Sequence, residues 1–187
     1  MAKQNLPAIF LIFLVGILLS GCGGASPAGQ PTAAAPDIPS LALAAEGEPG
    51  QPLRIYGQVV DASTNAPIPG ARLYFYQANS DGEYLPSDPN DTATARLSGE
   101  ITTGETGEFV LNTILPGEYD RPGSRHIHLH YVRAEGYEEI NRTILFEDNA
   151  SVEMRQWAEE TGLGILLELD EGGGLMAGNL VIMLPPE

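Results

Sequence analysis

Residues 57–84 read GQVVDASTNAPIPGARLYFYQANSDGEY, and this stretch decides the fold class. It contains two short runs rich in β-branched and aromatic residues, separated by the cluster STNAPIPG. Such runs are typical of β-strands, and a cluster of Asn, Pro and Gly between them is typical of a turn. The stretch therefore predicts two strands joined by a turn.

The same pattern recurs through the rest of the chain. We predict strands over residues 53–61, 71–78, 107–114, 126–132, 140–146, 164–170 and 178–184. Short strands punctuated by Gly, Pro, Asn and Asp are typical of an antiparallel sandwich. One short helix is predicted over residues 151–162, with Ser151 as its N-terminal cap and Gly162 as its C-terminal cap. The predicted fold class is all-β, an antiparallel β-sandwich with one short helix, and its loop 79–105 is long enough to carry function.

All three histidines of the chain lie in the stretch RHIHLHY, residues 125–131. Residues two apart on a strand point to the same face, so His126, His128 and His130 direct three imidazoles the same way. Imidazole is the commonest protein ligand for transition metals. The spacing alone is equally compatible with a metal site and with a solvent-facing strand.

The N-terminus resembles a bacterial lipoprotein signal. An apolar run, LPAIFLIFLVGILL, follows Lys3 and ends in LSGC at Cys22, the only cysteine of the chain. The run is short for a membrane span, and its flanks are those of an export signal. The resemblance implies a signal peptide over residues 1–21 and a lipid on Cys22. We expect a lipid-anchored protein of the cell envelope, outside the cytoplasm, in the periplasm or on the cell surface.

Composition divides the remainder into a tether and one domain. Residues 22–52 are rich in Ala, Gly and Pro without a helical or strand pattern, which predicts a flexible tether. Residues 53–187 have the size of one domain with a single core. The net charge of −16 repels nucleic acid, so we expect no nucleic-acid partner.

Two stretches carry a family resemblance. Residues 57–84 contain PGA, YQAN and DGEY, and residues 107–128 contain GEF, TILPGEY and HIH. In this order the motifs resemble those of the intradiol ring-cleavage dioxygenases, ferric enzymes that open catechols between their two hydroxyls. The likeness continues to the closing strand at residues 179–184. It implies a β-sandwich of the intradiol dioxygenase catalytic core type.

The resemblance also implies a metal centre. In the family, Fe(III) is held by two tyrosines and two histidines, which correspond to Tyr84, Tyr119, His126 and His128. Ferric iron is a hard cation that favours anionic oxygen ligands, and two phenolates supply them. We prefer this register because HIH follows the tyrosine loop as in the family. A shift by two residues would instead make His128 and His130 the ligands.

The activity that the resemblance implies is ring cleavage. A small aromatic diol would bind the iron, displacing Tyr119, and react with O2 to give a muconate-type diacid. No organic cofactor is needed. The identity of the catechol and the oligomeric state stay open.

Two positions depart from the family pattern. The family places an arginine three residues before the first histidine ligand, where this chain has Gly123, with Arg121 and Arg125 on either side. Either arginine can supply the positive charge that stabilises the reacting substrate. A glutamine of the family, on the strand after the histidines, corresponds to Thr143. Threonine is shorter, which implies a wider or less polar substrate pocket.

Other functions are compatible with the same residues. The stretch 57–75 also resembles transthyretin-like modules, which serve as spacers or binding domains on surface proteins. A third hypothesis is a fold that binds iron or a catecholate without turnover. Ferric phenolate is coloured, so the colour of the protein separates a metal centre from a spacer.

Overall fold

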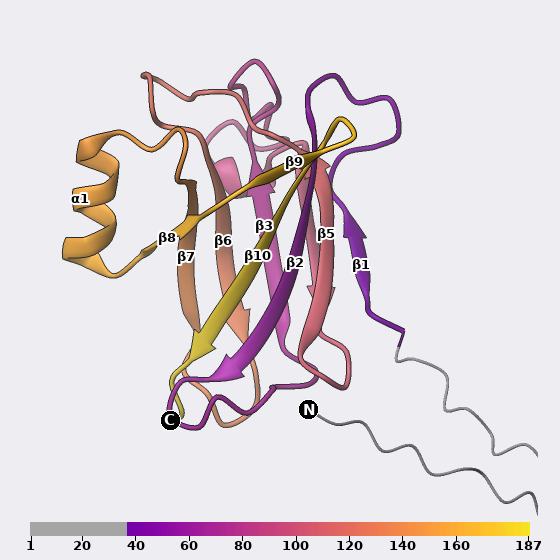
Figure 1. Cartoon of the computed structure of the whole chain (residues 1–187), viewed down its shortest axis with the longest axis vertical. Helices are drawn as coiled ribbons and strands as arrows, with labels where there is room; N and C mark the ends of the chain where they lie inside the picture. The colour runs from indigo at the N-terminus through magenta and orange to yellow at the C-terminus, as the bar shows by residue number, and fades with distance from the viewer. Residues whose placement is uncertain (1–36) are drawn as a thin grey trace, which may run out of the picture. The chain divides into compact units, whose positions relative to one another are not determined.

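The computed structural model describes residues 37–187, which form two facing five-stranded sheets (Figure 1). Sheet A has the order β1 (Ser40–Ala42), β5 (Glu108–Ile114), β2 (Pro52–Asp61), β10 (Leu175–Leu184) and β9 (Asp170–Gly172). Sheet B has the order β4 (Leu97–Thr102), β3 (Arg72–Gln77), β6 (His126–Arg133), β7 (Ile140–Phe146) and β8 (Gly164–Leu167). A short 3-10 helix, η1 (Thr92–Thr94), and one α-helix, α1 (Val152–Thr161), complete the described part. The expected signal peptide (1–21), Cys22 and the first part of the tether lie outside it.

The predicted β-sandwich with one short helix is confirmed, although its sheets are mixed. Most strand pairs are antiparallel, but β1 pairs with β5, β2 with β10, and β7 with β8 in parallel. The helix has the predicted caps: the side chain of Ser151 accepts a hydrogen bond from the backbone of Met154, and Gly162 is left-handed with φ 66°. Within residues 37–187 no helix is long and apolar enough to cross a membrane.

Two strands lie where we expected none. Residues 97–102, inside the expected loop 79–105, form β4 and pair with the whole of β3. Residues 40–42, inside the expected tether 22–52, form β1 and pair with β5. The sandwich therefore begins before residue 53. The expected strand 164–170 ends as β8 at Leu167, and β9 begins at Asp170.

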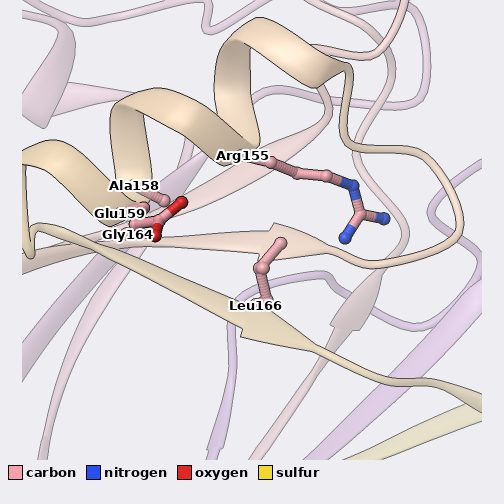
Figure 2. Close-up of a pocket in the computed structure, with 5 residues that line it drawn as sticks. All are labelled: Arg155, Ala158, Glu159, Gly164 and Leu166. Carbon is pink, nitrogen blue, oxygen red and sulfur yellow. The ribbon is translucent and has the colours of Figure 1, made fainter.

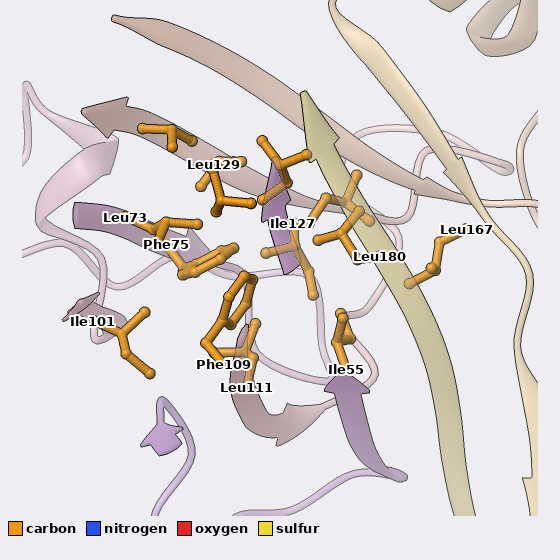
Figure 3. Packing of buried hydrophobic residues seen from close by; sticks show 14 of the residues in the cluster. Ile55, Leu73, Phe75, Ile101, Phe109, Leu111, Ile127, Leu129, Leu167 and Leu180 are labelled. Carbon is orange, nitrogen blue, oxygen red and sulfur yellow. The ribbon is translucent and has the colours of Figure 1, made fainter. Parts of the chain in front are cut away.

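The core lies between the two sheets and fixes which face of β6 the histidines occupy. Phe75 of sheet B and Phe109 of sheet A meet with ring centroids 5.7 Å apart (Figure 3). Ile127 and Leu129 of β6 are fully buried in the same cluster. Each such buried side chain contributes about 1.5–3 kcal/mol of hydrophobic free energy. Because side chains alternate along a strand, the residues between them face outward, on the outer face of sheet B.

Candidate metal centre

Three donor atoms converge on the outer face of sheet B. The hydroxyl oxygen of Tyr84 lies 2.9 Å from Nε2 of His126 and 3.0 Å from Nε2 of His128. The two Nε2 atoms are 2.9 Å apart. The three atoms therefore form a nearly equilateral triangle, and the ring of Tyr84 is only 8% exposed.

Hydrogen bonding alone does not explain this triangle. Nδ1 of His126 lies 2.6 Å from the carbonyl oxygen of Ser124, which can only accept, so Nδ1 carries the ring proton and Nε2 is a bare lone pair. Burial lowers the pKa of His126, and burial together with the neighbouring His126 and His130 lowers the pKa of His128 to about 3. Both rings are neutral near pH 7. Only the hydroxyl of Tyr84 and Nε2 of His128 can then carry a proton toward the triangle, so at most two protons are available for its three contacts.

A cation fits the donor atoms better than protons do. Two ligands about 2.1 Å from a metal and at right angles are about 3.0 Å from each other, which is the edge of this triangle. Burial raises the pKa of Tyr84, so its phenol ionises only beside a positive charge. Among residues 37–187 no group of three or more His, Cys, Asp or Glu side chains is placed to hold a metal, so this site needs its tyrosine.

Two glycines explain how Tyr84 and Tyr119 reach the same place. Gly82 has φ 85°, and a Cβ there would lie 2.3 Å from the carbonyl oxygen of Glu118. A Cβ on Gly117 would lie 2.4 Å from the backbone nitrogen of Gly82. The loops of the DGEY and PGEY motifs therefore pack backbone against backbone, a contact that only glycine allows. Consequently the rings of Tyr84 and Tyr119 meet edge to face, with centroids 5.2 Å apart.

The turn that carries Tyr84 is organised by Asn79. Its side-chain oxygen accepts hydrogen bonds from the backbone N–H groups of Asp81 and Glu83, at 3.0 and 2.9 Å. Its carbonyl oxygen accepts a further bond from the backbone of Gly117, at 2.8 Å. The bond from Asp81 to the side-chain oxygen is an Asx turn, and the backbone of the same asparagine holds the second loop.

The two other predicted metal residues, Tyr119 and His130, differ in their distance from the triangle and are both exposed. Tyr119 lies next to Tyr84, but its side chain is 48% exposed. His130 is exposed and packs beside Tyr74 and Tyr76 instead of joining the triangle. The arrangement thus brings His126 and His128 together with Tyr84 and leaves His130 outside. Whether Tyr119 is a ligand stays a prediction.

The two candidate arginines differ in burial. The side chain of Arg125 is partly buried, and its Nε is a buried donor without a hydrogen-bond partner within residues 37–187. Arg121 is exposed; hydrogen bonds to the backbone and to Ser151 at the start of α1 lower the pKa of Glu153, and the charge of Arg121 adds a smaller effect. Burial thus distinguishes the two arginines, but no contact within residues 37–187 joins either guanidinium to the triangle, so the role of each stays a prediction.

Gly123 has a structural reason to replace the arginine of the family. Its φ is 78°, and a Cβ there would lie 2.7 Å from Cβ of Ser151. Its backbone donates to a carboxylate oxygen of Glu118 at 3.0 Å and accepts from the backbone of Ser151 at 3.1 Å. The loop before His126 is therefore fastened to the beginning of α1, and no longer side chain fits at position 123.

Thr143 lies directly across from His128 in the antiparallel pair of β6 and β7, and so on the same face of sheet B. Both residues line a hollow of about 210 Å³. A residue that the motifs contain but that we assigned no role, Tyr76, lies against it: its ring stacks on that of His128, with centroids 4.3 Å apart and an angle of 14°. The position of Tyr76 in the YQAN motif was the sequence signal that could have identified it as a site residue.

Another hollow, of about 360 Å³, lies between α1 and β8 (Figure 2). Its lining residues are Arg155, Ala158, Glu159, Gly164 and Leu166. Arg155 is already engaged, because its guanidinium donates to the carbonyl oxygens of Glu147 and Ala150. With no histidine or tyrosine in its lining, this hollow does not offer the donors of the candidate metal centre.

Comparison with known proteins matches the chain to one family. The family model Dioxygenase_C, described as dioxygenase, matches residues 26–171. The catechol 1,2-dioxygenase of Acinetobacter baylyi is 30% identical over 112 residues, covering 51% of this chain and 36% of that protein. The hydroxyquinol 1,2-dioxygenase of a Rhizobium species is 29% identical over 119 residues, covering 55% and 40%. The matches thus span less than half the length of these two relatives.

Solved structures show the same fold. The dioxygenase domain of a dioxygenase carbohydrate-binding protein fusion from Streptomyces sp. SirexAA-E superposes with a TM-score of 0.62 at 28% identity, covering 82% of this chain and 92% of that one. The 3-chlorocatechol 1,2-dioxygenase of Rhodococcus opacus superposes with a TM-score of 0.59 at 26% identity, covering 80% and 64%. Because the family model matches most of its length, the chain belongs to the dioxygenase family.

Proposed function

We propose that this protein is an Fe(III)-dependent intradiol dioxygenase, which cleaves a catecholic ring between its hydroxyls with O2 to give a muconate-type diacid. The observation that carries the proposal is the triangle of Tyr84, His126 and His128. Its three donor atoms come from a buried tyrosine and two half-buried histidines, have fewer protons than contacts, and are spaced as ligands of one metal. Family membership supports the same reading.

The iron would be held by Tyr84, Tyr119, His126 and His128, and when bound it withdraws electron density from the coordinated catechol. His126 presents Nε2 because Ser124 holds its Nδ1 proton. Tyr84 is fixed by burial, whereas Tyr119 is exposed and can yield its place to the substrate. The unequal burial of the two tyrosines thus supports a permanent and an exchangeable ligand.

Arg125 would stabilise negative charge on the reacting substrate. Its Nε is buried without a hydrogen-bond partner among residues 37–187, and Arg125 directly precedes His126 in the sequence. A fixed positive charge in a water-poor pocket stabilises developing anionic character more than water does. Thr143, across from His128, would border the substrate.

The test is a visible spectrum and oxygen uptake of the purified protein loaded with iron. We expect one iron per chain, a ferric phenolate colour, and one O2 consumed per ring with catechol or hydroxyquinol. A colourless protein without iron favours the transthyretin-like spacer. A coloured protein that binds catechols without oxygen uptake favours binding without turnover.

We also propose that the protein is anchored by a lipid on Cys22 at the cell envelope, outside the cytoplasm. The support is sequence alone: a short apolar run ending in LSGC at the only cysteine. Cys22→Ala should move the protein out of the membrane fraction. A variant that stays in the membrane fraction with its signal cleaved contradicts the anchor.

A further inference from the structure

Strand β6 carries a β-bulge beside the candidate metal centre. Its pairing register shifts against both neighbouring strands, between Leu129 and Val132 on the β7 side. Leu129 and Val132 both point into the core, whereas the two residues between them, His130 and Tyr131, both lie outside it. Bulges redirect side chains and are over-represented next to active sites. This bulge places two consecutive rings on the outer face of sheet B.

The redirected rings form an aromatic surface with Tyr74 of β3. The rings of Tyr74 and Tyr131 are stacked, with centroids 5.7 Å apart and an angle of 23°. His130 stands edge-on to Tyr74 with centroids 5.8 Å apart. Together with Ala93 and Thr94 of η1, the aromatic surface lines a hollow of about 190 Å³. Aromatic rings that line an open hollow are suited to contact another planar ring.

Neighbouring contacts hold this surface in place. The hydroxyl of Tyr74 donates to the carbonyl oxygen of Ala93 at 2.8 Å. The guanidinium of Arg133 lies 3.9 Å from the ring centroid of Tyr131. Asp91 also lines the hollow; one of its carboxylate oxygens accepts from the backbone of Ala93, and the other has no hydrogen bond within residues 37–187. That oxygen can accept a hydroxyl of a ligand.

The aromatic surface is continuous with the candidate metal centre. Tyr76 stacks on His128 and is 5.9 Å from His130, measured between ring centroids. His130 lines this hollow and also the hollow of about 210 Å³ that His128 and Thr143 border. His130 follows His128 by two residues, so the surface begins roughly 7 Å from the histidine along the strand.

We propose that the aromatic surface binds a second planar ring of the substrate, so that the preferred substrate is a catechol joined by a short linker to another aromatic ring. The inference rests on the proposed function for the ring that reacts. It gives His130, which lies outside the metal triangle, a role in substrate selection. A saturated sugar-like ring is the competing occupant, and the test separates the two.

The experiment compares three substrates with the iron-loaded protein: catechol, 4-(2-phenylethyl)catechol and 4-(2-cyclohexylethyl)catechol. The last two differ only in whether the distal ring is flat and aromatic. We expect kcat/KM for the phenylethyl compound to exceed that for the cyclohexylethyl compound by about three- to tenfold, the selectivity that one aromatic contact gives. His130→Ala and Tyr131→Leu should each reduce this preference several-fold. The matched control is Tyr56→Leu, an exposed tyrosine of sheet A, which should keep it.

The outcomes separate the inference from the proposed function. Equal kcat/KM for the two substituted catechols, or a preference unchanged in both variants, overturns the inference while turnover of catechol upholds the proposed function. If no catechol is turned over, the proposed function fails, and calorimetric binding of the phenylethyl compound decides the inference instead. Binding must then weaken in His130→Ala and Tyr131→Leu but not in Tyr56→Leu, and any other pattern overturns it.

Discussion

The side-chain amide of Gln77 donates a hydrogen bond to the carbonyl oxygen of Ile114 at 2.9 Å, and both residues are buried. Gln77 is the last residue of β3 in sheet B, and Ile114 is the last residue of β5 in sheet A. The chain leaves these two strand ends to form the loops of Tyr84 and Tyr119. One amide therefore joins the two sheets at the point from which both candidate tyrosine ligands depart.

Replacing this amide should destabilise the sandwich and loosen the centre. Gln77→Leu leaves the carbonyl of Ile114 and the hydroxyl of Thr113, which donates to Gln77 at 2.9 Å, without partners. Because an unpaired buried polar group costs about 1–3 kcal/mol, we expect the free energy of unfolding to fall by about 2–4 kcal/mol. Denaturant unfolding measures this. Gln58→Leu, which removes a half-buried amide bond to Thr106, is the control and should cost about 1 kcal/mol or less.

Tyr84→Phe should abolish the metal centre without unfolding the protein. The change removes one hydroxyl and almost no volume, so the core stays packed while the site loses its buried anionic ligand. Iron per chain and visible absorbance should both drop sharply. Tyr56→Phe, on the exposed outer face of sheet A, should leave them unchanged. Full colour in Tyr84→Phe would exclude this residue as a ligand.

A second pair of variants tests whether the histidine ligands are His126 and His128 or His128 and His130. His126→Ala removes one corner of the triangle, so stoichiometric iron should be lost. His130→Ala changes an exposed ring outside the triangle, so iron should be retained. Metal analysis after dialysis gives the answer. Iron lost from the second variant but not from the first would support His128 and His130 as the ligands.

Arg125→Ala should keep the iron and lose most activity. Removing a fixed donor that stabilises developing charge typically lowers kcat about 100-fold or more. Arg121→Ala should retain most activity, because this side chain is exposed to water, which screens its charge. Oxygen uptake with a catechol compares the two at equal iron content. A greater loss in Arg121→Ala would assign the charge to that residue instead.

The turn after β2 should make stability depend on pH. Asp61 accepts hydrogen bonds from the hydroxyl and backbone of Ser63 and from the backbone of Thr64, which hold its pKa below the usual range. A depressed pKa stabilises the fold above the unfolded value of about 4, and that contribution is lost as pH falls toward the folded value. The melting temperature should therefore fall on acidification. Asp61→Asn should lower it at pH 7 and flatten its acid dependence; an unchanged acid slope would contradict the assignment.

The sequence predicted those strands and caps whose signals are local. The alternating runs of β2, β3 and β6 and the Ser151 and Gly162 caps of α1 all carry such signals. β4 was missed because LSGEIT has weak strand propensity and is held by pairing with β3 along its length. β1 was missed because three residues in an Ala- and Pro-rich stretch carry no pattern.

In the candidate site, the sequence motifs identified the side chains that lie close together. They did not indicate the backbone features that hold those side chains in place. Nothing in RHIHLHY indicates a bulge, because the extra residue is defined only by the strands on either side. The constraint on Gly123 likewise comes from Ser151, which is distant in sequence. The buried state of Arg125 compared with Arg121 depends on how that loop is fastened. These are tertiary effects, and they decide which of the two neighbouring arginines is buried.

The parallel pairing of β2 with β10 also determines when the fold can be completed. Leu53 pairs with Met176, and the register continues to Asp61 and Leu184. The first long strand of the sandwich therefore cannot complete its pairing until the last strand is available. Until β10 is in place, β2 has an open edge in the middle of sheet A. Non-local closure of this kind slows folding and leaves an unpaired edge exposed meanwhile. A truncation that removes β10 should consequently yield an aggregating chain instead of a smaller domain.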